Sequence, residues 1–554
     1  MAKINGETII ARALKTQGVE TIYGVVGIPV SGIAAAAQRE GIRYYGMRHE
    51  MPATYAGQAT GYLNGRIGVS LVVSGPGALN AVGAFANAWS NRWPLLMLGG
   101  ASDATRADMG DFQEAEQVAA MAPYAKYARR AESTARLPLY VAEAVRKAIN
   151  GTPGPSYLDL PGNIIFDEVD EEDVEWAPRV PDPPRLRADD SAVADAIAAL
   201  KTAEQPLIVI GKGISFGRAE AEMRRFVEQT GIPYLAMPMA RGILPDDHPQ
   251  SIAAARSFVL KNTDLVFLGA ARLNWMLHFG QPPRWRDDVR VVQLDSNPEE
   301  IGVNVPTEVG LVGDAKVTLG QLLDALDEEP WQFPQDSEWL QTVRSEARKN
   351  QDLVEGMIGA GRDGEPFGYY TTLDIVRRLA PRDAVYVTEG EGTMAIGRTL
   401  LDNFAARQRL DAGSFGSMGL GHGFAVAAQV EHPNQRVICV QGDSAFGFAG
   451  MECEVAVRHG LPITWVVVNN NGIGGTPLEH FERENLPPGG LNPGTRYDKV
   501  MEGLGGVGYH CETPEQIEAA LEEALTLDGP SLIHVPIDPQ AKRKPQEFRW
   551  LAPR

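Results

Sequence analysis

Two polar stretches, each placed directly after an apolar run, hold the residue types best suited to chemistry. Asp443 follows the run 437–440, and Asn470 follows the run 463–468. A helix-like segment separates the runs, so the pattern predicts a βαβ unit whose parallel strands end at one sheet edge. A carboxylate, an amide oxygen and the backbone carbonyl of Gly472 suit a Mg²⁺ ion shared with a diphosphate. The alternative for Asp443 is a helix N-cap.

The rest of the chain repeats the strand–helix pattern that would position such an edge. Apolar runs alternate with helical patterns over residues 1–185, 191–330 and 366–540. This alternation predicts an α/β fold of three doubly wound domains with parallel sheets. The basic and aromatic tail, residues 541–554, is expected to close over the substrate site, and a disordered solubilising tail is the alternative. The acidic, proline-rich segment 166–190 predicts a linker after the first domain.

Composition narrows the class of protein. The 554 residues carry a formal net charge of −20, which disfavours a nucleic-acid partner. The three cysteines, Cys439, Cys453 and Cys511, form no CxxC pair, so we expect neither a disulfide scaffold nor a zinc site, and a cytoplasmic location. Apolar runs stay below the ~20 residues of a membrane span, so we expect no membrane association.

The two polar stretches resemble a known motif. Gly442-Asp443-Ser444 together with Asn469-Asn470 is similar to the diphosphate–metal motif of thiamine-diphosphate enzymes. The whole-chain order, with an early glutamate in Arg48-His49-Glu50 and a middle α/β domain, resembles the acetolactate synthase-like superfamily. The resemblance implies that Glu50, expected at the end of a short strand over residues 44–50, hydrogen-bonds the pyrimidine ring of the coenzyme.

Further segments resemble the branch that contains 2-hydroxyacyl-CoA lyases and oxalyl-CoA decarboxylase. They are residues 389–399, 409–413, 442–448 and 496–498. The loop Asp111-Phe112-Gln113-Glu114 favours the lyase side, because the decarboxylases carry a Tyr-Glu pair where Phe112 and Gln113 stand. The resemblance implies cleavage of a 2-hydroxyacyl-CoA, an acyl-CoA thioester, into formyl-CoA and an aldehyde or ketone.

The resemblance also implies the residues of a thiamine-diphosphate site. Met418 would lie as a wedge beneath the coenzyme, and the Gly416 carbonyl would accept from its amino group. The metal ligands would be Asp443, Asn470 and the Gly472 carbonyl. The complete set of implied cofactor-binding residues is Glu50, Gly392, Thr393, Met394, Gly416, Met418, Gly442, Asp443, Ser444, Ala445, Asn470, Gly472 and Ile473.

Fewer residues are candidates for binding the substrate or for acting on it. Gln113 cannot act as a base, but it can position the substrate hydroxyl or carbonyl, with Phe112 beside it. His480, with Glu479 and Glu482, is a candidate base, and a polar surface loop is the alternative for all three. Arg256 and Arg398 match CoA-binding arginines of the branch, and guanidinium groups suit phosphate.

One departure concerns the segment after the metal asparagine. The branch usually carries Gly-Ile-Tyr there, whereas this chain has Gly472-Ile473-Gly474. Loss of the phenol at Gly474 enlarges the space near the reacting carbon. We therefore expect tolerance of a branched substrate such as 2-hydroxyisobutyryl-CoA.

The middle domain and the assembly complete the expectations. Arg272, Asp295 and Asp314 sit at predicted strand ends, and by resemblance they would bind ADP; FAD is a weaker match, and an empty domain is the alternative. The resemblance also implies a site shared between two subunits, hence a homo-oligomer, expected as a dimer of dimers (a homotetramer).

Three other functions remain open at this point. Two are enzymes of the same superfamily, namely an oxalyl-CoA decarboxylase that releases CO₂ and an acetolactate synthase-like carboligase. The third is a nucleotide-sensing or scaffold protein that kept the fold without the chemistry. The presence of Glu50, Asp443 and Asn470 disfavours the third.

Overall fold

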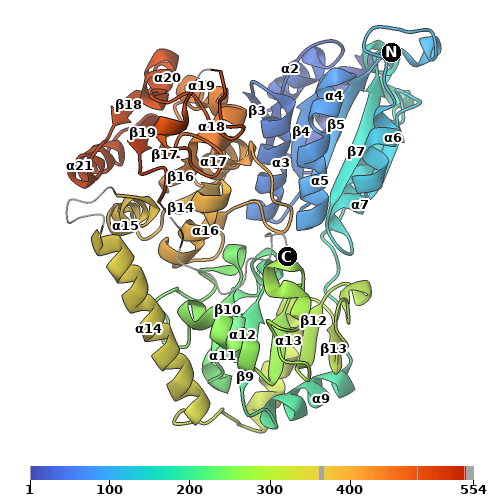
Figure 1. Cartoon of the computed structure of the whole chain (residues 1–554). Helices are drawn as coiled ribbons and strands as arrows, with labels where there is room; N and C mark the ends of the chain where they lie inside the picture. The colour runs from blue at the N-terminus through green and yellow to red at the C-terminus, as the bar shows by residue number, and fades with distance from the viewer. Residues whose placement is uncertain (1, 361–366, 483, 542, 544–554) are drawn as a thin grey trace.

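Three parallel sheets, each covered by helices on both faces, divide the chain into three α/β domains (Figure 1). The computed structural model describes residues 2–360, 367–482, 484–541 and 543. The segment predicted to be a tail therefore lies almost wholly outside the described residues. Within them, no helix combines the length and the hydropathy that crossing a bilayer requires.

The N-terminal domain contains a six-stranded sheet in the order β3-β2-β4-β5-β7-β6. Its strands are β2 (Thr21–Gly24), β3 (Arg43–Gly46), β4 (Gly68–Val72), β5 (Leu95–Ala101), β6 (Tyr127–Arg130) and β7 (Pro155–Pro161). Its helices are α1 (Gly6–Thr16), α2 (Ser31–Arg39), α3 (Glu50–Asn64), α4 (Pro76–Asn80), α5 (Val82–Asn91), α6 (Gln117–Met121), α7 (Leu137–Ile149) and α8 (Gly162–Phe166). An antiparallel pair, β1 (Lys3–Asn5) with β8 (Glu168–Asp170), closes the domain.

The middle domain contains a five-stranded sheet in the order β10-β9-β11-β12-β13. Its strands are β9 (Pro206–Ile210), β10 (Tyr234–Ala236), β11 (Leu265–Gly269), β12 (Arg290–Asp295) and β13 (Val309–Val312). Its helices are α9 (Asp190–Lys201), α10 (Lys212–Phe216), α11 (Glu220–Thr230), α12 (Arg256–Asn262) and α13 (Ala315–Glu328). The long helix α14 (Glu338–Ala360) then runs from this domain to the C-terminal one, as the yellow helix of Figure 1 shows.

The C-terminal domain repeats the strand order of the first, as β15-β14-β16-β17-β19-β18. Its strands are β14 (Val385–Glu389), β15 (Arg409–Leu410), β16 (Val437–Gly442), β17 (Ile463–Asn469), β18 (Val507–His510) and β19 (Ser531–Pro536). Its helices are α15 (Tyr369–Leu379), α16 (Glu391–Leu400), α17 (Leu420–Glu431), α18 (Asp443–Ala449), α19 (Cys453–His459), α20 (Tyr497–Leu504) and α21 (Pro514–Ala524). Its strand order turns back between β14 and β16, and ligands of open α/β sheets bind at such a point.

The N-terminal and C-terminal domains are joined mainly through α3 and α17. Phe424 of α17 is fully buried and contacts the rings of Tyr55 and Trp93, with centroids 5.6 and 5.5 Å away. A Cβ at Gly423 would lie 2.4 Å from the Pro52 carbonyl oxygen, so only glycine permits this approach of the two helices. The helices that carry Glu50 and follow Met418 are therefore packed against each other.

The structure corrects the expectation for Glu50. The strand predicted over residues 44–50 ends at Gly46, and Glu50 is the first residue of α3. His49 caps this helix by accepting a hydrogen bond from the Met51 amide. A glutamate in the first turn is favourable because the N–H groups at a helix N-terminus carry partial positive charge. Local capping thus outweighs the β-propensity of the preceding tyrosines.

Candidate active site

The carboxylate of Asp443 lies where β16 and β17 end side by side. The two strands pair in parallel with Gly442 opposite Val468, which brings Asp443 next to the turn after β17. Asp443 is 2% exposed, and its Oδ1 and Oδ2 accept from the amides of Ser444 and Gly472, each at 2.7 Å. Burial raises the pKa of Asp443 to about 6. The structure thus brings the two sequence motifs together at one sheet edge.

Three oxygen atoms converge at this edge, which is the observation that tests the fit of a metal ion. The Asn470 side-chain oxygen lies 2.7 Å from the Gly472 carbonyl oxygen and 3.3 Å from Asp443 Oδ1. The Asn470 amide nitrogen points the other way and donates to the Tyr369 hydroxyl at 2.8 Å. Such acceptors repel one another unless the Asn470 amide turns its nitrogen toward them or a cation lies between them. With the amide oxygen turned inward, the set of three oxygens fits Mg²⁺.

The turn after β17 depends on glycine. Gly472 has φ +135°, and a Cβ there would lie 2.1 Å from the Gly489 carbonyl oxygen. Ile473 is 61% exposed beside it. A Cβ at Gly474 would meet nothing within 4 Å, although its φ of +84° favours glycine. Gly474 is thus open to solvent in the single chain.

A second wall of the site is the start of α16. Gly390 has φ +90°, and the buried Thr393 hydroxyl donates to the Glu389 carbonyl oxygen. A Cβ at Gly392 would lie 3.3 Å from the Tyr369 ring, so this glycine and the tyrosine form one surface. Met394 is half-buried, with its sulfur 3.4 Å from the Arg398 guanidinium.

The loop that carries Gly416 and Met418 is held by the N-terminal domain. Asn87 donates to the Phe415 carbonyl oxygen at 2.9 Å, and the Tyr55 hydroxyl donates to Ser417 Oγ at 3.0 Å. Gly416 is exposed, a Cβ there would meet nothing within 4 Å, and Met418 is half-buried. The Gly416 backbone is thus open to a ligand while its neighbours are fixed.

A buried carboxylate, Glu389 at the end of β14, anchors the far side of this loop. It accepts from the backbone amides of Gly421 at 2.9 Å and Leu420 at 3.3 Å, and also from that of Gly419 and from the Gln441 amide. Burial raises the pKa of Glu389 to about 7, and these donors oppose that rise. Glu389 therefore fixes the N-terminus of α17 directly after Met418.

Glu50 is buried in the N-terminal domain. Its Oε2 accepts from Asn80 at 3.1 Å, and a Cβ at Gly77 would lie 3.0 Å from its Oε1. Gln113 has φ +56°, and its Oε1 accepts from the Ser74 hydroxyl at 2.6 Å. The segment from Ser74 to Asn80 thus contacts both residues.

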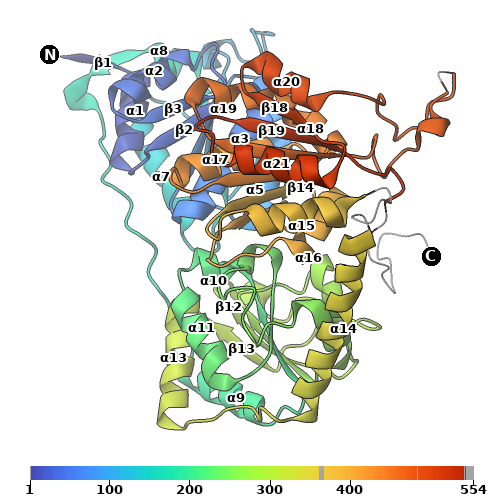
Figure 2. The same cartoon turned by 90° about the vertical axis from the view of Figure 1, so that its left-hand side faces the viewer.

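The other candidates for the chemistry lie on exposed loops. Phe112 is 65% exposed. His480, in the short 3-10 helix η9 (Leu478–His480), is exposed, as are Glu479 and Glu482. The segment after β17 reaches away from the body of the molecule, as the orange-red loop in Figure 2 shows. In the single chain these side chains therefore face solvent.

The two candidate CoA-binding arginines have partners within the chain. Arg398 forms an ion pair with the buried Asp411 at 2.9 Å. Arg256 donates to the Met276 carbonyl oxygen, and burial, with the charges of Arg284 and Arg398, lowers its pKa to about 10. These arginines are close enough to repel one another, so an anion placed among them would be stabilised.

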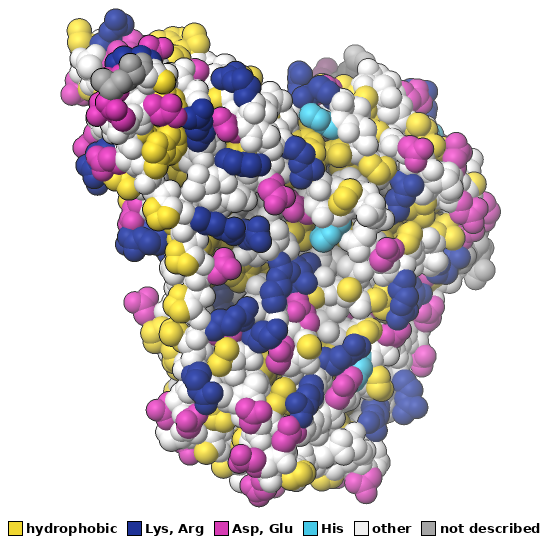
Figure 3. Space-filling model, turned by 180° about the vertical axis from the view of Figure 1, so that it is seen from behind, with side chains coloured by type: hydrophobic (Ala, Val, Ile, Leu, Met, Phe, Trp, Pro, Cys, Tyr) yellow, Lys and Arg dark blue, Asp and Glu magenta, His cyan; other side chains and the backbone are white. Residues whose placement is uncertain are grey.

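A cavity of about 630 Å³ lies between the N-terminal and middle domains. Arg272, Asp295 and Asp314 all line it, and Asp314 also caps α13 and pairs with Arg185 at 2.9 Å. Other basic lining residues are Arg66, Arg92, Arg179, Lys212 and Arg218. Figure 3 shows Lys and Arg side chains gathered across the waist of the molecule, where these domains meet. Basic residues thus outnumber the acidic ones around this cavity, in a chain whose net charge is negative.

Some residues of the site escape sequence reasoning. Asn80, Tyr369 and Gln441 contact Glu50, Asn470 and Glu389 respectively, across separations of 30, 101 and 52 residues. Tyr369 follows a segment without an apolar strand pattern, so no local signal points to it. Glu389 carries a weak signal, because it ends a predicted strand next to Gly390.

Comparison with known proteins agrees with this geometry. Residues 4–120, 193–322 and 390–535 match the N-terminal TPP binding, central and C-terminal TPP binding domains of thiamine pyrophosphate enzymes. The chain therefore belongs to the thiamine pyrophosphate enzyme family. Its three matched regions correspond to the three parallel sheets.

Particular relatives narrow the comparison within that family. The chain is 45% identical to 2-hydroxyacyl-CoA lyase 1 of Homo sapiens, over 99% of this chain and 97% of the relative. It is 37% identical to 2-hydroxyacyl-CoA lyase of Arabidopsis thaliana, over 97% and 96%. Oxalyl-CoA decarboxylase of Escherichia coli K12 is 39% identical, over 99% and 98%. The predicted resemblance to this branch is confirmed.

The buried Glu389 gives a prediction about stability. The native protein holds a proton on Glu389 up to about pH 7, whereas an ordinary glutamate releases it near 4.5. The native state therefore binds more protons in this interval, and the unfolding free energy contributed by Glu389 falls as pH rises from about 4.5 to 7. We expect the thermal midpoint of the wild type, minus that of Glu389→Gln, to fall steadily as the pH rises over this range.

The matched control is Glu132→Gln, because Glu132 is 68% exposed. Its difference from the wild type should stay flat across the same pH range. If the difference in thermal midpoint between the wild type and Glu389→Gln stays constant or grows with pH, the raised pKa of Glu389 would be contradicted.

Proposed function

We propose that the chain is a thiamine-diphosphate-dependent carbon–carbon lyase that cleaves a 2-hydroxyacyl-CoA into formyl-CoA and an aldehyde or ketone. The observation that carries the proposal is the convergence of oxygens from Asp443, Asn470 and Gly472 in a chain similar over almost its whole length to 2-hydroxyacyl-CoA lyases. Oxalyl-CoA decarboxylase is the second candidate, because a relative of that name matches equally far.

In this proposal the C-terminal domain holds the diphosphate end of the coenzyme. The three oxygens would bind Mg²⁺, with the diphosphate completing its coordination. Gly392, Thr393 and Met394 would line one side, and Gly442, Ser444, Ala445 and Ile473 the other. Ser444 and Ala445 stand in the first turn of α18, where backbone N–H groups favour an anion. Bound thiamine diphosphate supplies a carbon nucleophile and an electron sink for cleavage next to a carbonyl.

The N-terminal domain would contribute the acid of the site. Glu50 is buried and held by Asn80, so its carboxyl is oriented before any ligand binds. It would exchange a proton with the ring nitrogen of the aminopyrimidine, while the Gly416 carbonyl accepts from the amino group. Met418, on the loop fixed by Glu389, would support the bend of the coenzyme.

Residues of several loops would contact the acyl-CoA. Gln113 is oriented by Ser74 and would position the substrate hydroxyl or carbonyl, with Phe112 covering the site. His480 would exchange the proton of the C2 hydroxyl. Arg256 and Arg398 would face the CoA phosphates, because the charges of Arg284 and Arg398 both act against that of Arg256 and a polyanion among them would relieve this repulsion.

We also propose that two copies of the chain complete the site. Ile28 of the N-terminal domain and Phe448 of the C-terminal domain are 69% and 58% exposed, which is costly for large apolar side chains in water. Contact between these surfaces of two copies would bury both and cover Phe112 and Ile473. A homodimer, paired again as a homotetramer, satisfies this requirement. The three buried free cysteines suit the reducing cytoplasm.

The lyase reaction is tested with Glu50→Gln. The amide keeps the shape of the side chain but cannot exchange the proton, so kcat should fall by about 10²–10⁴ while thiamine diphosphate and Mg²⁺ still raise the thermal midpoint. Formyl-CoA release from 2-hydroxyacyl-CoA is measured by chromatography. The control Glu132→Gln should keep full activity.

Two results would contradict this reading. Wild-type protein that releases CO₂ from oxalyl-CoA faster than it cleaves any 2-hydroxyacyl-CoA would favour the decarboxylase. If thiamine diphosphate with Mg²⁺ does not raise the thermal midpoint of the wild type, the protein has the fold of the family but does not catalyse the reaction.

The open space at Gly474 generates a specificity prediction. Gly474→Tyr fills this space, so we expect kcat/KM for 2-hydroxyisobutyryl-CoA to fall at least about tenfold relative to a straight-chain substrate, within the range that pocket size gives. Gly474→Ala is the matched control, because it shares the backbone strain at φ +84° but lacks the phenol. Equal substrate ratios in all three proteins would exclude the role.

The cavity of the middle domain generates a prediction for ADP. We propose that Arg272 contacts its phosphates, while Asp295 and Asp314 accept from the ribose. Arg272→Ala should weaken ADP binding in calorimetry by about 1.5–3 kcal/mol, roughly 10- to 150-fold. Arg39→Ala, an exposed change on α2, should leave it unchanged. Absence of ADP binding by the wild type would leave the cavity without this role.

A further inference from the structure

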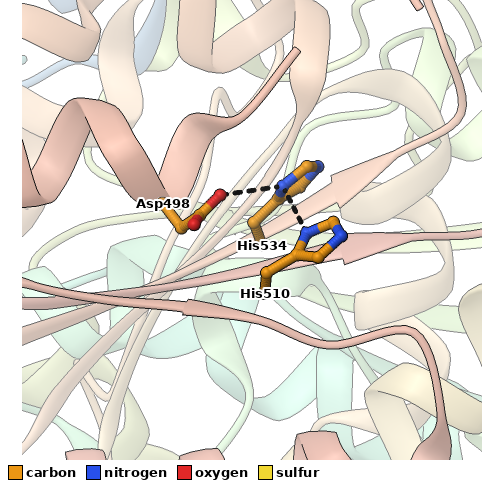
Figure 4. Close-up of side chains that lie close together, drawn as sticks. All are labelled: Asp498, His510 and His534. Atoms are coloured by element: carbon orange, nitrogen blue, oxygen red, sulfur yellow. Dashed lines mark hydrogen bonds and ion pairs between the residues drawn. The ribbon is translucent and has the colours of Figure 1, made fainter. Parts of the chain in front are cut away.

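A cluster of three ionisable side chains lies behind the candidate metal site. Asp498 comes from α20, His510 from β18 and His534 from β19, and Figure 4 shows them pointing toward one another. His534 Nδ1 lies 3.1 Å from His510 Nδ1 and 3.4 Å from Asp498 Oδ1. The three atoms lie within 4.8 Å of one another, so a metal centre is the first possibility to test.

Asn469, the last residue of β17, decides where the protons of this cluster lie. Its Oδ1 accepts from the Asn471 amide at 2.9 Å, which fixes the orientation of its side chain. Its Nδ2 then faces His534 Nε2 at 3.0 Å. Because an amide nitrogen only donates, Nε2 accepts, and a neutral His534 carries its hydrogen on Nδ1.

The remaining protons follow in sequence. His534 Nδ1–H donates toward His510 Nδ1 and Asp498 Oδ1, so His510 carries its own hydrogen on Nε2. That nitrogen lies 3.4 Å from Glu512 Oε1, an acceptor. Arg496 donates to both carboxylate oxygens of Asp498, at 2.8 and 2.6 Å. Each ring nitrogen has a complementary partner.

This arrangement is incompatible with a metal centre in the structure as it stands. A metal between the two rings needs a lone pair on both Nδ1 atoms, but His534 Nδ1 carries a hydrogen. Burial lowers the pKa of His534 to about 4, so its ring is neutral near pH 7. The cluster is therefore a chain of hydrogen bonds with a defined direction, which begins at the Asn469 amide and ends at Glu512.

We infer that His534 is a positioning residue for the turn that carries the proposed metal ligands. It holds the Asn469 side chain, whose oxygen in turn holds the amide of Asn471, a residue at φ +61°. Asn470 and Gly472 stand on either side of Asn471, so their oxygens depend on this turn. The inference rests on the proposed metal site, since it concerns the support of those ligands.

Two substitutions separate positioning from packing. In His534→Gln, the side-chain oxygen can replace Nε2 as the acceptor for Asn469, whereas His534→Leu fills the space without an acceptor. Calorimetric titration of Mg²⁺ into protein with excess thiamine diphosphate should show binding weakened about 10- to 100-fold in His534→Leu, the usual effect of losing support for a ligand. His534→Gln should bind within a few-fold of the wild type.

The thermal midpoints of the metal-free proteins supply the second measurement. If His534 acts only in packing, the thermal midpoints of both variants fall by similar amounts and both variants bind Mg²⁺ as the wild type does. That result would overturn the inference. Wild-type protein that fails to bind Mg²⁺ would instead overturn the proposed function on which it rests.

Zinc tests the proton assignment directly. Titration of Zn²⁺ into the wild type and into His510→Gln should give the same isotherm if hydrogens occupy the cluster. A Zn²⁺ site that is present in the wild type and lost in His510→Gln would show that the cluster is a metal centre, and the inference would be wrong.

Discussion

Three oxygen atoms that face one another at the ends of β16 and β17 are the constraint to which the rest of the structure responds. Asp443, Asn470 and Gly472 bring two lone-pair-bearing side chains and a carbonyl within 2.7–3.3 Å without a donor between them. Such an arrangement needs rigid supports, and its repulsion would be relieved by a cation or by the Asn470 nitrogen turned toward the two oxygens. The supports are visible on each side: Tyr369 orients the amide of Asn470, and backbone amides bind the carboxylate of Asp443.

The same design recurs around the site. Glu389, a buried carboxylate, binds the amides that open α17 and so fixes the loop of Met418. Asn87 and Tyr55 of the N-terminal domain hold the other end of that loop. A polar group left without a partner in such surroundings is costly, so these networks restrict the loop to one conformation. Rigid loops around an open Gly416 backbone are what a coenzyme site requires.

One cavity is lined by more basic than acidic residues, although the net charge of the chain is negative. The net charge is −20, yet the cavity between the N-terminal and middle domains is lined by arginines and by Lys212. Lys212 lies over the Trp93 ring, 5.1 Å from its centroid, and burial lowers its pKa well below the ordinary value. Keeping cations buried together lowers stability unless an anion joins them. The acidic net charge of the chain and the excess of basic over acidic residues in this one cavity together favour entry of small anions over nucleic acids.

The sequence alone determined the three α/β domains, the two polar strand ends at Asp443 and Asn470, and the family, because strand periodicity and strand-end residues act over short distances. Asp443 and Asn470 could be paired in advance, since parallel neighbouring strands end at one edge. The sequence misplaced Glu50, where helix capping by His49 overrode a strand pattern. Only the tertiary structure decided the partners: Asn80 for Glu50, Tyr369 for Asn470, and His534 for Asn469 across 65 residues. Such hydrogen bonds leave no periodic trace, because they depend on where distant elements meet.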